Sequence, residues 1–195
     1  MVPKQFRSVK PEIRILGIDD GQFVSHSKGF VGVVGVVYRG GYWFEGVMWS
    51  EIIIDGLDAT EKIVEMIKNS PYYGELRIVV LDGVTLAGFN VVDINELSQM
   101  VDLPIMSVTR KKPDLEKIRR ALKNLPEFNK RWRAILNAGE LFEVETRNGE
   151  NPIYIQIAGI SFDDAEVIMK KTSTLSNIPE ALRVAHILAS GLFRR

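Results

Sequence analysis

Three hydrophobic segments near the beginning of the chain have the length and composition of β-strands. Residues 13–18 are almost all apolar, which is typical of a strand buried on both faces. Phe30 to Tyr38 is rich in valine, and the turn residues Arg39-Gly40-Gly41 separate it from a third extended segment, Tyr42 to Ile54. Because the connections are short, the pattern predicts an antiparallel meander of three strands.

After this meander the hydrophobic period changes from that of strands to that of helices. In DGLDATEKIVEMIKNS, Asp58 has the position of an N-cap and Glu61, three residues later, completes a capping box. Apolar residues at helical spacing follow, which predicts a helix. Next come a predicted strand from Leu76 to Leu81, a helix around Asp93 to Val101, a strand in LPIMSV and a long helical region from Pro113 to Asn137. Alternating strands and helices imply parallel strands joined by right-handed crossovers.

The last third of the chain predicts a hairpin followed by two helices. The segment ELFEVETRNGENPIYIQIAGI has the pattern of two strands that turn at Asn148-Gly149. Ser161 to Lys171 begins with a serine cap, and Pro179 to Leu192 has proline in its first turn. A three-strand meander, then parallel strands with crossover helices, is the α/β plan of ribonuclease H-like mixed sheets. The alternative is a doubly wound sheet with an added hairpin.

Length and composition indicate the class of protein and exclude several kinds of site. At 195 residues, the whole chain (residues 1–195) is expected to form a single ribonuclease H-like domain. The absence of cysteine excludes a disulfide framework, a thiolate nucleophile and zinc–thiolate sites. Neither a signal peptide nor a membrane-spanning run is recognisable, so we expect a cytoplasmic protein without a membrane partner. The pattern does not predict an oligomeric state.

Two adjacent carboxylates end the first predicted strand, in the segment ILGIDDGQF. Asp19 and Asp20 follow a buried run, and Asp82 ends the fourth predicted strand in the same way. Parallel neighbouring strands bring their carboxyl ends together, so Asp19 and Asp82 are expected to be close neighbours. Carboxylate oxygens are the ligands of Mg²⁺ or Mn²⁺, which support phosphodiester hydrolysis. Asp19, Asp82 and Asp20 are therefore the candidate catalytic residues.

A third metal ligand could come from the segment between the third strand and the first helix. Asp55 and Asp58 are the candidates there, alongside Asp19 and Asp82. Each acid also has a purely structural interpretation. Asp58 has the pattern of an N-cap, and Asp82-Gly83 is a common turn dipeptide. A turn requires only one of Asp19 and Asp20, which favours a ligand role for the pair.

A basic stretch follows the fifth predicted strand, although the whole chain has no net charge. Residues 110–133 contain ten basic and three acidic residues, a local net charge of +7. Arg110, Lys111 and Lys112 lie directly after a strand end, where binding groups gather, and are the candidate nucleic-acid contacts. Phe128 and Trp132 could stack on bases, but their helical spacing favours a place in the core. His26 and His186 carry no clear signal, and His186 is expected to be a packing or surface residue of the last helix.

Three motifs together resemble an archaeal family of long-unassigned function that is related to endonuclease V. They are GIDDG in the first strand, DGLDATE after the third and VVLDGVTLAGFNVVDI around the fourth, and the resemblance extends from about Glu12 to Leu192. Endonuclease V has the ribonuclease H-like fold and nicks nucleic acid near deaminated bases, using magnesium held by acidic residues. The resemblance implies that Asp19, in Gly17-Ile18-Asp19, and Asp82 are metal ligands. It also implies a basic residue near Arg110 and Lys111.

The chain departs from the endonuclease V pattern in two places. It lacks the Pro-Tyr-Ile-Pro wedge and the metal-binding glutamate that follows it, for which Asp55 or Asp58 is the candidate replacement. The histidine after the Asp-Gly motif is also absent, since Val84-Thr85-Leu86 stands there. The leading hypothesis is a magnesium- or manganese-dependent endonuclease that acts near deoxyuridine or deoxyinosine in DNA, with RNA as the alternative nucleic acid. The alternatives are a non-catalytic nucleic-acid-binding or assembly module and, ranked last, an actin-like ATPase or sugar kinase.

Overall fold

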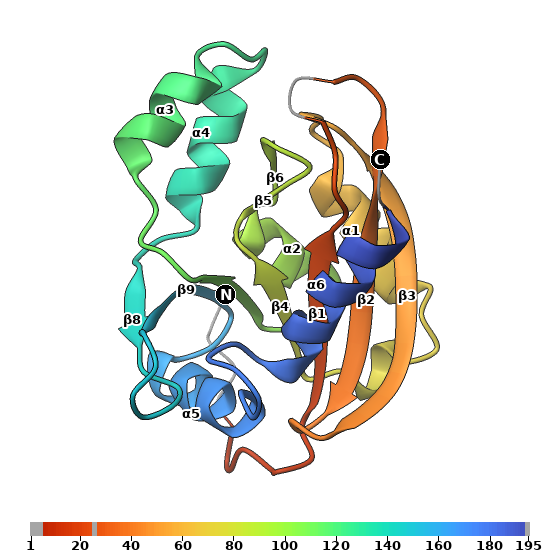
Figure 1. Cartoon of the computed structure of the whole chain (residues 1–195), viewed down its shortest axis with the longest axis vertical. Coiled ribbons are helices and arrows are strands. Elements are labelled where there is room, and N and C mark those ends of the chain that lie inside the picture. The colour runs from red at the N-terminus through yellow and green to blue at the C-terminus, as the bar shows by residue number, and fades with distance from the viewer. Residues whose placement is uncertain (1–5, 25–26, 194–195) are drawn as a thin grey trace.

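The computed structural model describes residues 6–24 and 27–193. Its main sheet has seven strands in the order β3-β2-β1-β4-β7-β9-β8 (Figure 1). These strands are β1 (Arg14–Asp20), β2 (Phe30–Arg39), β3 (Trp43–Ile53), β4 (Ile78–Asp82), β7 (Ile105–Thr109), β8 (Phe142–Val144) and β9 (Ile153–Ala158). A separate small hairpin consists of β5 (Thr85–Leu86) and β6 (Asn90–Val91). The helices are α1 (Ala59–Lys68), α2 (Ile94–Val101), α3 (Leu115–Leu122), α4 (Phe128–Asn137), α5 (Phe162–Thr172) and α6 (Glu180–Leu192), with a short 3-10 turn, η1 (Tyr73–Glu75).

The strand directions confirm the predicted ribonuclease H-like plan. Strands β1, β2 and β3 form an antiparallel meander, whereas β4 pairs with β1, and β7 with β4, in parallel. The predicted C-terminal hairpin extends the sheet beyond β7, because β9 pairs antiparallel with both β7 and β8. Strand β1 therefore lies next to β4 in the middle of the sheet, and both strands end at the same edge.

Helices cover both faces of the sheet (Figure 1), and each face has one large hydrophobic core. On one face, Leu16 and Ile18 of β1 pack in the core that contains the apolar sides of α1 and α2. On the other face, Ile15 packs in the core that contains Ala165 of α5 and Leu182 of α6. Because side chains alternate along a strand, neighbouring residues of β1 enter different cores. This explains why the predicted strand is apolar at nearly every position.

The long helical region predicted from Pro113 to Asn137 is wrong in detail, because it forms two helices. Helix α3 ends at Leu122, and α4 begins at Phe128. Pro126 cannot donate a helical hydrogen bond, and Glu127 has a left-handed φ of 56°. The two helices therefore form a hairpin at the carboxyl-end edge of the sheet (Figure 1).

The longest helix, α6, has 13 residues. Within residues 6–24 and 27–193, we find no helix with the length and apolar character needed to cross a membrane.

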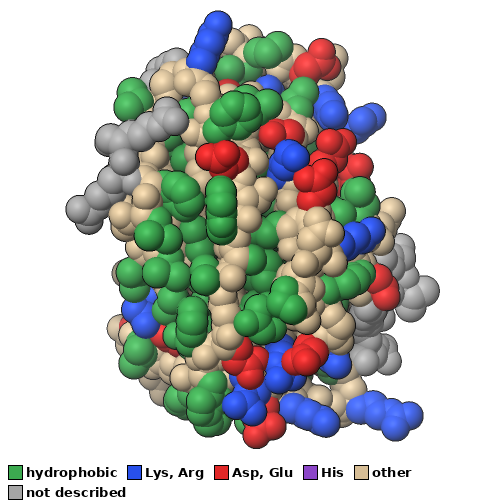
Figure 2. Space-filling view, turned by 90° about the vertical axis from the view of Figure 1, so that its right-hand side faces the viewer, with side chains coloured by type: hydrophobic (Ala, Val, Ile, Leu, Met, Phe, Trp, Pro, Cys, Tyr) green, Lys and Arg blue, Asp and Glu red, His purple; other side chains and the backbone are tan. Residues whose placement is uncertain are grey.

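Strand β3 lies at one edge of the sheet and carries large hydrophobic side chains to the surface. Figure 2 views this side of the molecule, where hydrophobic side chains gather. Exposed on the strand are Trp43, Phe44, Val47, Trp49 and Ile53. The aromatic ring of Trp49 packs beside that of Phe193, which follows α6. The edge strand and the end of the last helix thus share one surface.

Candidate active site

The adjacent carboxylates at the end of β1, Asp19 and Asp20, lie on opposite faces of the sheet. Asp19 lies on the face covered by α6, where its Oδ2 atom is 2.6 Å from Nδ1 of His186. Asp20 lies on the other face, where its Oδ2 atom accepts a hydrogen bond of 2.8 Å from the backbone N–H of Ala87. The two acids therefore have different partners, and only Asp19 belongs to the cluster described next.

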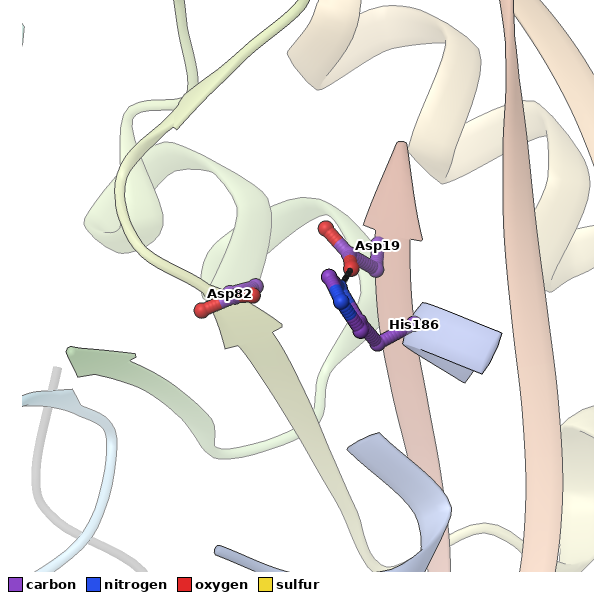
Figure 3. Close-up of side chains that lie close together, drawn as sticks. All are labelled: Asp19, Asp82 and His186. Atoms are coloured by element: carbon purple, nitrogen blue, oxygen red, sulfur yellow. Dashed lines mark hydrogen bonds and ion pairs between the residues drawn. The ribbon is translucent and has the colours of Figure 1, made fainter. Parts of the chain in front are cut away.

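Asp19, Asp82 and His186 form a cluster at the carboxyl ends of β1 and β4 (Figure 3). Each residue offers one potential ligand atom, and these atoms all lie within 4.8 Å of one another. Asp19 is 4% exposed, whereas the side chain of His186 is 49% exposed. The cluster thus has a buried carboxylate at its base and an imidazole that reaches solvent. The structure brings Asp19 and Asp82 together as the parallel-strand argument predicts.

A glycine in β1 allows α6 to bring His186 to this position. A Cβ atom at Gly17 would clash with the backbone of Ala181 and Leu182, so the helix rests directly on the strand. His186 is four residues after Leu182 and hence lies on the same side of α6, one turn further along. Close packing at Gly17 therefore sets the distance between α6 and Asp19.

Burial and mutual repulsion raise the pKa values of the acids. The pKa of Asp19 is raised to about 7, mainly by burial and then by the negative charges of Asp82 and Asp20. Hydrogen bonds from His186 and from the N–H of Asp20 oppose this increase. Burial also raises the pKa of Asp82, against the positive charge of Arg110. Ionising both carboxylates in this buried site is unfavourable, so a bound cation would stabilise their charged forms.

The second acid of the pair, Asp20, holds the β5–β6 hairpin. Its pKa is raised to about 6, mainly by burial, although the hydrogen bond from Ala87 opposes the shift. Ala87 has a left-handed φ of 45°, so this hydrogen bond fixes an unfavourable turn conformation. The structure therefore gives Asp20 an anchoring contact to a neighbouring segment.

Asp55 and Asp58 are directed away from the cluster, towards the same hairpin. The Oδ1 atom of Asp55 accepts a hydrogen bond of 2.8 Å from the N–H of Phe89. Asp58 is the N-cap residue of α1 but makes no side-chain cap, and instead accepts hydrogen bonds from Ile53 N–H and from the Asn90 amide. The predicted capping box is thus wrong, because the Asp58 carboxylate binds Ile53 and Asn90 and leaves Glu61 N–H without it, while Asn90 accepts the N–H of Ala59 at the start of α1. Among the described residues, no side chain of residues 55–58 therefore joins Asp19, Asp82 and His186 as a potential metal ligand.

The three predicted basic contacts lie on the segment between β7 and α3, as the sequence indicates. Arg110, Lys111 and Lys112 are all exposed, and Arg110 is near enough to Asp82 to affect its pKa. Arg131 differs from the rest of the basic stretch, since it is only 2% exposed and donates to backbone carbonyls. Trp132 and Phe128 stack on each other and pack against a small core, as their helical spacing favoured.

The sequence interpretation missed His186, which was expected to be a packing or surface residue. A usable signal is present in α6, where small residues at positions 181, 185 and 189 mark a face for close packing. His186 adjoins that face, and Gly17 provides the matching surface two residues before Asp19. His26, the other histidine, lies outside the described residues.

The donor set suits a hard or borderline divalent cation. Two carboxylates and one imidazole are ligands that Mg²⁺, Mn²⁺ and related ions accept. Asp19 is buried beside Asp82, and its protein partners are His186 and the N–H of Asp20, so a cation would complete the neutralisation of the two carboxylates. These residues therefore fit a divalent metal ion.

Comparison with known proteins identifies the family. The model of the endonuclease dU family matches residues 11–193. A UPF0215 protein of Methanothermobacter thermautotrophicus is 51% identical over 188 residues, which cover 96% of this chain and 91% of the relative. A solved protein of unknown function from Archaeoglobus fulgidus is 38% identical, with a TM-score of 0.84 over 94% of this chain and 99% of that chain.

More distant solved structures share the fold. Endonuclease V of Bacillus subtilis aligns with a TM-score of 0.63 at 13% identity, covering 97% of this chain and 85% of that chain. Endonuclease V of Ciona intestinalis, solved with a DNA containing an inosine, aligns with a TM-score of 0.56 at 13% identity, covering 89% and 82%. The ribonuclease H-like fold and the relation to endonuclease V agree with the prediction from the three motifs. With a family match over almost its whole length, the chain belongs to the endonuclease dU family.

Proposed function

We propose that this protein is a divalent-metal-dependent endonuclease that hydrolyses phosphodiester bonds in DNA near deaminated bases, deoxyuridine or deoxyinosine. The observation that carries the proposal is the convergence of Asp19, Asp82 and His186 at the carboxyl ends of two parallel strands. Membership of the endonuclease dU family and a fold shared with endonuclease V support it.

Asp19, Asp82 and His186 would hold the metal ion, Mg²⁺ or Mn²⁺. When bound, such an ion activates water and stabilises the charge on the leaving oxygen. When Asp19 is ionised it can only accept, so Nδ1 of His186 donates to it and the lone pair is on Nε2. In the neutral imidazole, that lone pair can bind a metal ion or take up a proton. Arg110, beside Asp82, can neutralise a phosphate that approaches the cluster.

A nicking assay tests the proposal on labelled oligonucleotides carrying deoxyuridine, deoxyinosine or an abasic site, with Mg²⁺, Mn²⁺ or EDTA. We expect metal-dependent cleavage of a deaminated substrate, reduced at least about a hundredfold by Asp82→Asn. Asp163→Asn, which changes an exposed acid on α5, is the matched control and should cleave like the parent protein. Absence of cleavage in a folded protein that still binds DNA would instead favour a non-catalytic binding module.

A further inference from the structure

A cavity of about 350 Å³ lies beside the β5–β6 hairpin, which Asp20 of β1 contacts on the face of the sheet opposite α6. It lies between the β1–β2 connection, the turn of the β5–β6 hairpin and the end of α3. Its walls include Phe23, Asp55, Gly88, Phe89 and Leu125. This volume is in the range of pockets that enclose small molecules.

Short connections link the cavity to the strand that carries Asp19. Asp20, the next residue of β1, accepts the N–H of Ala87, which immediately precedes the wall residue Gly88. The carbonyl of Ala87 accepts the N–H of Asp55 at 2.9 Å. Phe23 follows Asp20 by three residues. A nucleotide whose phosphate contacts the cluster could therefore direct its base into this cavity.

The two carboxylate oxygens of Asp55 have different hydrogen-bonding environments. Oδ1 accepts the N–H of Phe89, whereas Oδ2 has no hydrogen-bond partner among the protein atoms of residues 6–24 and 27–193. A side chain at Gly88 would clash with this carboxylate, and Gly88 also has a φ of 85°, so glycine is required there. The arrangement leaves one charged acceptor for a donor that enters the cavity.

A buried arginine holds this arrangement in place. Arg131 donates to the carbonyls of Asp55 and Gly56 and to that of Phe89, and so ties the two segments that form the cavity wall. Asp55 has a left-handed φ of 51°, a conformation that persists only where the surroundings enforce it. The orientation of its carboxylate is thus fixed before any ligand arrives.

We propose that this cavity receives the extruded deaminated base and that Asp55 is its specificity-determining residue. Deamination converts a ring nitrogen from an acceptor into an N–H donor, both from cytosine to uracil and from adenine to hypoxanthine. A carboxylate accepts from that new donor and repels the lone pair of the parent base. The rings of Phe23 and Phe89 supply apolar surface against which a flipped base can stack. This inference rests on the proposed function and specifies how the protein would select its substrate.

The test compares binding of single-stranded oligonucleotides with one deoxyuridine, one deoxycytidine or one abasic site, by fluorescence anisotropy in EDTA. In Asp55→Asn the amide oxygen must serve Phe89 N–H, so the amide NH₂ replaces the free carboxylate oxygen and becomes a donor. We expect the deoxyuridine-to-deoxycytidine affinity ratio to fall at least about tenfold, and Asp163→Asn to retain it. Phe23→Ala should weaken deoxyuridine binding about tenfold or more and leave abasic binding unchanged.

The outcomes separate this inference from the nuclease proposal. Loss of the deoxyuridine preference in Asp55→Asn supports the cavity assignment even if the parent protein cleaves nothing. Cleavage of deoxyuridine DNA with a binding ratio unaltered by Asp55→Asn overturns the cavity assignment alone. A parent protein without any preference for deoxyuridine over deoxycytidine also overturns it. If Asp55→Asn fails to fold, Phe23→Ala decides, because equal losses on abasic and deoxyuridine strands contradict base stacking.

Discussion

The Nδ1 atom of His186 lies 2.6 Å from the Oδ2 atom of Asp19, although 167 residues separate them in sequence. This pairing joins the first strand of the sheet to the last helix, and it depends on the close approach of α6 to Gly17. Asp82 of β4 completes the cluster. Three elements from different parts of the chain thus define one candidate cation site.

Replacing His186 tests whether the imidazole takes part in catalysis. His186→Ala should lower kcat for a deaminated substrate by about a hundredfold or more and weaken metal binding, because a ligand or proton-accepting nitrogen is lost. Steady-state cleavage and a Mg²⁺ titration measure the two effects. Ile187→Ala, the next residue on α6 and 52% exposed, is the control. Unchanged kinetics in His186→Ala would show that the histidine is only a packing residue.

The metal-free protein should lose a stabilising contribution from Asp19 and Asp20 as the pH rises. The folded protein holds protons on Asp19 and Asp20 up to about pH 7 and about pH 6, whereas an unfolded aspartate releases its proton near the ordinary value of 3.8. The folded state therefore binds more protons between about pH 4 and pH 7, and this contribution to stability is lost across that interval. Above pH 7 the cost for Asp19 is on the order of a few kcal/mol.

Thermal unfolding in EDTA measures this effect through Asp19→Asn, which removes the charge and keeps the shape. The variant should melt several degrees above the parent at pH 8 and close to it at pH 4. Mg²⁺ at pH 8 should raise the Tm of the parent and leave that of Asp19→Asn almost unchanged. An equal difference at both pH values would contradict the raised pKa.

The exposed basic segment after β7 should govern the salt dependence of DNA binding. Lys111→Ala with Lys112→Ala should weaken binding of all sequences and reduce the slope of log K against log salt by about 0.9 for each phosphate that the protein no longer neutralises. Titrations at several salt concentrations give the slope. Lys68→Ala, in the last turn of α1, removes a comparable charge elsewhere and should not alter it. Equal slopes in all three proteins would place the DNA on another surface.

Arg131 should be a stabilising residue despite its place in the basic stretch. Its guanidinium donates to the carbonyls of Asp55, Gly56, Phe89 and Pro126, and Arg131→Met leaves these acceptors without a donor. We expect a loss of about 3 kcal/mol or more in the free energy of unfolding, measured by chemical denaturation. Arg133→Met, exposed on the same helix, should change stability by less than about 1 kcal/mol.

The meander and the parallel strands beside it could be predicted from local signals, whereas the sequence did not indicate that the β8–β9 hairpin joins the same sheet. β1 and β4 are each a run of buried residues that ends on an acid. Because the two strands are parallel neighbours, Asp19 and Asp82 lie at the same edge of the sheet. The predicted hairpin at Asn148-Gly149 is likewise present, between β8 and β9.

The rest of the site depends on how distant segments pack together, which the local sequence marks only in part. The role of His186 follows from how closely a distant helix packs on Gly17, and that distance is a property of the assembled sheet. Asp58 fits a capping box by its spacing to Glu61. In the structure, however, the buried side-chain amide of Asn90 donates to the Asp58 carboxylate and accepts the N–H of Ala59. Arg131 has the charge of its neighbours and a wholly different environment, which only the fold determines.

The long separation between Asp19 and His186 also has a consequence for biosynthesis. During translation the first strands and Asp82 leave the ribosome well before α6 does, because the helix spans residues 180–192. Until then the candidate cation site lacks one of its three side chains. A partly synthesised chain therefore lacks the complete candidate cation site until residues 180–192 have been made and α6 has packed on β1.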